Sequence, residues 1–120
     1  FWVETNAGRI MLSVLEDGRI RVNMGIPGFK PAQIPLAIDA QQAQYALELE
    51  GKSLMFSALE IGNPHALFQV ESVASAPLET LGPLLQDHAL FPERVNVGFI
   101  EQLSKDQINL RVFERGVGET

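Results

Sequence analysis

One apolar run constrains the fold of this chain more than any other feature of its sequence. Residues 54–59 carry apolar side chains at both alternating positions, a pattern typical of a strand that is covered on both faces. The run leads into Gly62-Asn63-Pro64-His65, where Pro64 fixes its own φ and keeps Asn63 out of the helical region. A sharp break that displays an amide beside an imidazole is therefore expected at the end of a central strand. Taken alone, such a break is most often an ordinary turn between strands.

Other short segments alternate apolar with polar residues, which indicates strands with one buried face. They are 10–14, 20–24, 45–50, 95–100 and 108–113. Asp17-Gly18 separates the first two of these segments and Ser104-Lys105-Asp106 separates the last two, so each pair predicts a hairpin. Residues 25–35 are rich in proline and glycine and predict a loop that crosses the surface.

A single helix is predicted around residues 80–87, with Thr80 as its N-cap and Pro83 in its first turn. Four side chains share one face of this helix at helical spacing. They are Leu81, Leu84, Leu85 and His88. With about seven or eight short strands to one helix, the sequence predicts the α+β class: a curved, mostly antiparallel or mixed β-sheet wrapped around a helix.

The composition narrows the classes of partner. None of the 120 residues is a cysteine, so neither a thiolate zinc site nor a cysteine nucleophile can be built from them alone. The formal charge is −6 and the nine Lys and Arg residues are scattered, which argues against nucleic acid and anionic membranes as partners. No apolar run approaches the roughly 18 residues of a membrane-spanning helix, and no signal peptide is recognisable, so we expect a cytoplasmic protein.

Both ends of the sequence lie inside recognisable patterns. The chain opens on Phe1-Trp2-Val3, already in an apolar run and without an initiator Met. It stops in the glycine-spaced segment 116–120. We therefore expect residues 1–120 to form a single domain that is a fragment of a longer protein.

Polar residues in the last two predicted strands are candidates for a site. Asn96 lies on the polar side of its strand, where the ordinary interpretation is a solvated side chain. Glu114 and Arg115 are neighbours, and both can serve one site only where the strand ends, as Gly116 suggests. The alternative is that they are ordinary surface residues, because an adjacent Glu and Arg is very common on surfaces. Residues 116–120 have the pattern of an anion-binding loop that leads into a helix. None of these features alone identifies a reaction.

Together, four segments closely resemble the diaminopimelate epimerase family in their order and spacing. They are residues 62–65, 78–85, 91–99 and 110–120, and residues 21–27 resemble a segment upstream in that family. The resemblance implies one half of a two-domain fold, mainly its second domain, cut before the central helix around which each half folds its sheet. It also implies a bacterial, cytoplasmic, homodimeric enzyme that uses no cofactor and no metal.

Members of this family invert one α-carbon of LL-diaminopimelate to give the meso form, in lysine and peptidoglycan biosynthesis. They use two cysteines, one from each half, as base and acid. The resemblance implies that one cysteine precedes Phe1 and the other follows Thr120, so the isolated chain is expected to be inactive. A thiolate at a helix N-terminus has the lowered pKa that such a base needs, since no pyridoxal is present to delocalise the carbanion.

The resemblance also implies roles for residues of this chain. Four of them would hold the substrate, chiefly its non-reacting amino-acid end: Asn63, Asn96, Glu114 and Arg115. His65 and Glu114 would lie near the thiols and tune their protonation. Ala66 stands where family members often carry a non-catalytic cysteine, and we expect no loss of function from it.

Two alternatives remain open at this point. One is a related cofactor-independent racemase or isomerase of the same fold. The Glu114-Arg115-Gly116 block argues against it, because those relatives do not need this grip on a distal amino-acid group. The other is a non-catalytic binding domain that keeps the fold without the thiols. The residues that follow Thr120 would distinguish them.

Overall fold

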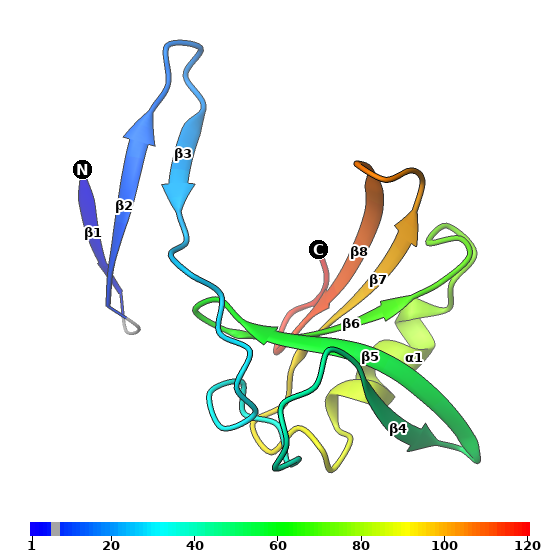
Figure 1. Ribbon diagram of the computed structural model, residues 1–120. Coiled ribbons are helices and arrows are strands. Elements are labelled where there is room, and N and C mark those ends of the chain that lie inside the picture. Colours follow the sequence, from blue (N-terminus) through cyan, green and yellow to red (C-terminus); the bar gives the residue numbers. More distant parts are fainter. Residues whose placement is uncertain (6–7) are drawn as a thin grey trace.

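Two β-sheets and one α-helix make up the computed structural model, which describes residues 1–5 and 8–120 (Figure 1). The first sheet is antiparallel and contains β1 (Trp2–Thr5), β2 (Gly8–Val14) and β3 (Ile20–Asn23). The predicted hairpin around Asp17-Gly18 is confirmed, with Gly18 at a φ of 85° that favours glycine. This sheet stands apart from the rest of the described chain, and the segment after β3 joins the two (Figure 1).

The second sheet has six strands in the order β4-β5-β6-β7-β8-β9. Their bounds are β4 Tyr45–Leu49, β5 Lys52–Glu60, β6 Pro64–Gln69, β7 Asn96–Gln102, β8 Ile108–Glu114 and β9 Gly118–Glu119. Neighbours are antiparallel except β6 and β7, which are parallel and joined by a crossover through α1 (Leu78–Gln86). The α+β class and the mixed sheet are confirmed. The described residues hold nine strands because β9 lies in the predicted glycine loop.

One face of the six-stranded sheet forms the core, together with α1. The side chains of this face are apolar and almost fully buried: Tyr45, Leu47, Phe56, Ala58, Ala66, Phe68, Val97 and Phe99. The rings of Phe56 and Phe68 lie 5.4 Å apart between centroids, and Phe91 meets Phe56 edge-on at 5.5 Å. Burying each of these rings contributes about 2–3 kcal/mol, so this cluster holds the sheet on the helix.

Two expectations about burial are wrong for the described residues. β5 is buried on one face only, because Phe56 and Ala58 are in the core whereas Met55 is 52% exposed. The proline-rich segment after β3 is not confined to the surface. Ile34 is 1% exposed and anchors this segment in the core, and Gly28 forms a β-bridge with Glu60. The pattern of prolines predicted a loop correctly but did not reveal its apolar anchor.

The helix begins earlier than the sequence indicates. α1 starts at Leu78 with Pro77 at the N-cap, because the Pro77 carbonyl accepts a hydrogen bond from the N–H of Leu81. Thr80 is therefore inside the helix, and Pro83 lies in the helix interior instead of the first turn. The buried face consists of Leu78, Gly82, Leu85 and Gln86. Leu84 was wrongly assigned to that face and is 41% exposed.

His88 lies beyond the end of α1 and has a structural contact. Its Nε2 donates to the carbonyl of Glu48 at 2.9 Å, and its Nδ1 accepts from the N–H of Leu90 at 3.1 Å. These bonds tie the end of the helix to β4. In the described part of the chain, no helix is long and apolar enough to cross a membrane.

Candidate functional site

The topology of the sheet brings the five predicted site residues to one edge. Because β6 and β7 run in parallel, their first residues lie side by side, and His65 is paired with Asn96. β8 runs antiparallel to β7, so its end at Glu114 reaches the same edge. The register places the side chains of His65, Asn96 and Glu114 on the face opposite the core.

The turn between β5 and β6 presents Asn63 and His65 together. Gly62 has a φ of 87°, and its N–H donates to the side chain of Glu60, which closes the turn. The Nε2 of His65 lies 3.0 Å from Oδ1 of Asn63. An amide oxygen only accepts hydrogen bonds, so Nε2 is the donor and Nδ1 is left with its lone pair.

The environment of His65 favours the neutral ring. Burial lowers the pKa of His65 below its ordinary value of 6.5, and the negative charge of Glu114 opposes this effect only in part. His65 at neutral pH is therefore an uncharged imidazole whose Nδ1 can accept a proton.

Asn96 is buried and only half satisfied. Its side chain is on a residue that is 3% exposed, and its Oδ1 accepts a hydrogen bond of 2.7 Å from the backbone N–H of Arg115. Its Nδ2 has no hydrogen-bond partner among the residues that the structure describes. Leaving a buried donor unpaired costs about 1–3 kcal/mol, which makes this amide a candidate for contact with a ligand.

Glu114 and Arg115 lie where β8 gives way to a tight turn. Val117 donates its N–H to the carbonyl of Glu114 at 3.2 Å, and Gly116 takes a φ of 81°. The predicted strand end is thus confirmed. One end of the exposed Arg115 guanidinium donates to the Glu93 carbonyl at 3.1 Å. A guanidinium has five N–H donors, so this bond leaves others for a carboxylate.

The glycine segment is more regular than an open anion-binding loop. Gly118 and Glu119 form β9 on β8, and the N–H of Thr120 donates to the carbonyl of Val112 at 3.1 Å. The N–H groups of Val117 and Thr120 are thus already bonded within this hairpin. Across it, Arg111 donates to Glu119 at 2.7 Å, and this hydrogen bond lowers the pKa of the Glu119 carboxyl.

Sequence reasoning missed the residues that support this edge from behind. Gln86 is 1% exposed and bonds to both Phe113 and Arg94. A helix phase that started at Leu78 would have placed Gln86 on the buried face. The positive φ of Arg94 has no signal in the sequence, because arginine rarely adopts it.

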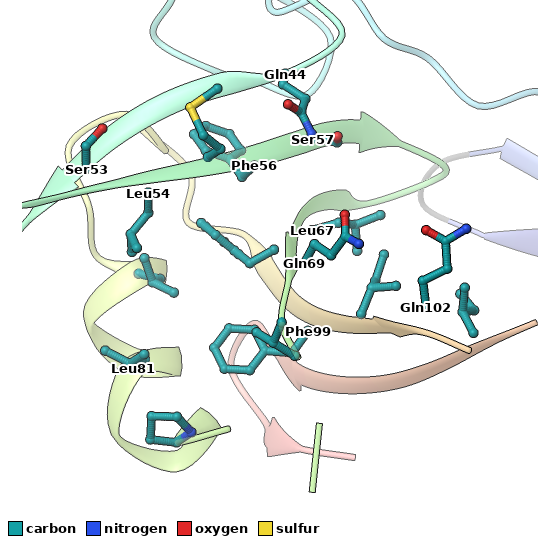
Figure 2. A pocket seen from close by; sticks show the side chains of 17 residues that line it. Gln44, Ser53, Leu54, Phe56, Ser57, Leu67, Gln69, Leu81, Phe99 and Gln102 are labelled. Carbon is teal, nitrogen blue, oxygen red and sulfur yellow. The ribbon is translucent and has the colours of Figure 1, made fainter. Parts of the chain in front are cut away.

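An open apolar cavity of about 610 Å³ lies elsewhere, and none of the five residues lines it. β5 and β6 pair only near their shared turn and then diverge, as Figure 1 shows, and the cavity occupies the opening. Leu54 and Phe56 reach it from β5, and Leu81 reaches it from α1 (Figure 2). Its lining has no charged side chain, so it offers no chemistry comparable to that of the sheet edge.

Comparisons with known proteins address the resemblance directly. A family model described as diaminopimelate epimerase matches residues 57–120, which include all five site residues. The chain is 50% identical over 118 residues to the diaminopimelate epimerase of Teredinibacter turnerae, and it is 49% identical to those of Ectopseudomonas mendocina and Thioalkalivibrio sulfidiphilus. Each alignment covers 98% of this chain.

The alignments cover 43%, 43% and 42% of these three relatives, so the chain spans less than half of their length. The family model matches more than half of the chain and ends with its last residue. The resemblance seen in the sequence is confirmed: the chain belongs to the diaminopimelate epimerase family.

Proposed function

We propose that the edge formed by β6, β7 and β8 is one wall of the substrate site of a diaminopimelate epimerase. In this proposal the full-length enzyme interconverts LL- and meso-diaminopimelate by moving the proton of one α-carbon. The observation that carries it is the buried Asn96 amide, whose Nδ2 has no partner among the described residues and whose Oδ1 is held by Arg115. This amide is held by the backbone of Arg115, whose guanidinium has further N–H donors, and such a pair of donors suits a carboxylate ligand.

The four proposed binding residues fall into two groups, one suited to the carboxylate and one to the ammonium of the substrate. Arg115 grips the carboxylate of the non-reacting end of the substrate, because a guanidinium can offer two parallel N–H groups. Asn96 adds its free donor to the same carboxylate. Glu114 and the amide oxygen of Asn63 suit the ammonium group of that end. Holding both groups of one amino-acid end selects which α-carbon meets the catalytic groups.

His65 and Glu114 support proton transfer. A neutral imidazole with an accepting Nδ1 can take a proton from a neighbouring acid, and the charge of Glu114 favours the protonated ring that results. The base and the acid themselves are two cysteines outside these 120 residues, which contain none. The reaction uses no cofactor, and the isolated chain is inactive; exchange of the substrate α-proton with deuterated solvent by the chain alone would contradict this.

The wider setting follows from the family and from the sequence. We place residues 1–120 mainly in the second domain of a cytoplasmic, homodimeric enzyme of lysine and peptidoglycan synthesis. What supports this placement is the resemblance of the whole chain to that family.

The substitution Arg115→Lys in the full-length enzyme tests the substrate grip. An ammonium cannot reproduce the paired N–H groups, and losing one charged hydrogen bond costs about 1.5–3 kcal/mol, so KM should rise by roughly 10- to 100-fold. Arg19→Lys is the matched control, because the Arg19 side chain pairs with Asp17 on an exposed turn, far from the proposed site residues in the sequence. An unchanged KM for Arg115→Lys would remove Arg115 from the site.

A further inference from the structure

Gln86 joins the two segments that carry the site. It is the last residue of α1 and is 1% exposed. Its Nε2 donates to the backbone carbonyl of Phe113 at 3.1 Å, and its Oε1 accepts from Nη2 of Arg94 at 2.9 Å. One buried amide is therefore bonded at both ends, to the end of β8 and to the turn before β7.

The two segments meet again on the other side of this link. Phe113 directly precedes Glu114 and Arg115, and Arg94 lies two residues before Asn96. The backbone N–H of Arg115 donates to Oδ1 of Asn96 at 2.7 Å. The site thus closes a ring of contacts that begins and ends at Gln86.

Arg94 has the least favourable backbone conformation among the residues of this ring, so it depends on its neighbours to stabilise it. Its φ of 62° is unfavourable for a residue with a Cβ, at a cost of about 1–2 kcal/mol. Its N–H donates to the carbonyl of Phe91 at 3.0 Å, and its guanidinium is bonded by Gln86 and, at 3.1 Å, by Asp87. The same turn directs the carbonyl of Glu93 to the guanidinium of Arg115.

An apolar side chain could fill the space that Gln86 occupies, but it would not fix how the bonded segments are oriented relative to α1. Hydrogen bonds are directional, and each end of the Gln86 amide specifies where one strand lies relative to α1. The side chain of the neighbouring Leu85 is equally buried but belongs to the apolar core, so packing and hydrogen bonding are divided between two adjacent residues.

We propose that Gln86 is a positioning residue, which sets the spacing between the start of β7 and the end of β8 and thereby aligns Asn96 with Arg115. Its consequence for catalysis rests on the proposed function. The alignment itself does not, because it concerns only bonds within the chain.

The test uses the full-length enzyme with Gln86→Met, which keeps the size of the side chain and removes both bonds. Amide hydrogen exchange, resolved by NMR, follows the N–H of Arg115 and the ladder N–H groups within β7 and β8. We expect exchange at Arg115 to accelerate by about tenfold, the equivalent of one lost hydrogen bond, while the ladder N–H groups keep their rates. Leu85→Met is the control for packing and should leave Arg115 no more affected than the ladder.

Gln86→Glu provides a second variant if Gln86→Met does not fold. It keeps an acceptor for Arg94 and loses the donor to Phe113, so the change at Arg115 should have the same sign. Exchange at Arg115 that is unchanged, or that accelerates only in step with the ladder, would overturn the proposal. In the kinetics we expect KM to rise about tenfold with kcat changed less than about threefold. If exchange at the Arg115 N–H accelerates while KM stays unchanged, the positioning role is upheld and the proposed binding of substrate by Arg115 is refuted.

Discussion

Gly82 lies on the buried face of α1, against Phe113 of β8, and its replacement by alanine tests how closely the helix is seated on the sheet. A Cβ at Gly82 would lie 2.6 Å from Cγ and 3.0 Å from Cβ of Phe113. Rotation of the ring about the Cβ–Cγ bond moves neither atom, and a change of χ1 would move Cγ but leave Cβ in place. Either α1 or β8 has to shift.

Two opposed effects determine how much Gly82→Ala changes the free energy of unfolding. Alanine favours a helix over glycine by about 1 kcal/mol. Overpacking of a close contact costs about 1–3 kcal/mol, and here one contact is with Cβ of Phe113, which no side-chain rotation can move. We therefore expect Gly82→Ala to lower the free energy of unfolding by about 1 kcal/mol. Because Phe113 precedes Glu114 and Arg115, we also expect a higher KM.

Gly98→Ala is the matched comparison. A Cβ at Gly98 would also lie 2.6 Å from its nearest neighbour, but that neighbour is Cδ2 of Leu67, the far end of a flexible side chain. Leu67 can adopt another rotamer, so we expect a change within about 0.5 kcal/mol. Urea unfolding of the two full-length variants measures both values. A Gly82→Ala enzyme as stable as the wild type, or a Gly98→Ala enzyme equally destabilised, would refute this reasoning.

Two further predictions concern a turn and a titrating group. Glu50 and Gly51, between β4 and β5, have φ values of 53° and 81°, as a type I′ turn requires. Asparagine tolerates a positive φ better than glutamate, so Glu50→Asn should raise the free energy of unfolding by about 0.5–1 kcal/mol. A lower urea midpoint for this variant would contradict the prediction. Burial lowers the pKa of His65 in the folded protein. Below about pH 6.5 the unfolded state therefore binds more protons than the folded state, so the free energy of unfolding falls as the pH drops from 6.5 toward the lowered pKa. His65→Asn should make this decline shallower in unfolding curves measured between about pH 7.5 and 5, and identical declines would count against the shifted pKa.

Local sequence patterns predicted where the strands lie more accurately than they predicted which faces of the strands are buried. The alternation around Val97 and Phe99 gave the core-facing side of β7 correctly, because the period of two depends only on neighbouring residues, although Asn96 on the other side is buried too. The two-sided burial of β5 was wrong at Met55, since covering a face depends on distant segments. The helix start was misplaced because Thr80 is a good cap by chemistry, whereas Pro77 begins α1 through its backbone carbonyl.

The candidate site was found through family likeness, and the topology then explained it. Nothing local in the sequence indicates that β6 and β7 are parallel, so the pairing of His65 with Asn96 could not be derived from spacing. The burial of Asn96 was equally hidden, because its polar side of the strand predicted solvent. Gln86 was missed for a related reason: its two partners lie in other segments of the chain.

The parallel pairing of β6 with β7 also governs the order in which the site can assemble during folding. The hairpins β2–β3 and β7–β8 join neighbours in the sequence, so they close small loops and can form early. His65 meets Asn96 only after the whole crossover through α1 has closed, which is a larger and slower step. The two sides of the site are therefore expected to come together late, at the same moment as the core beneath them.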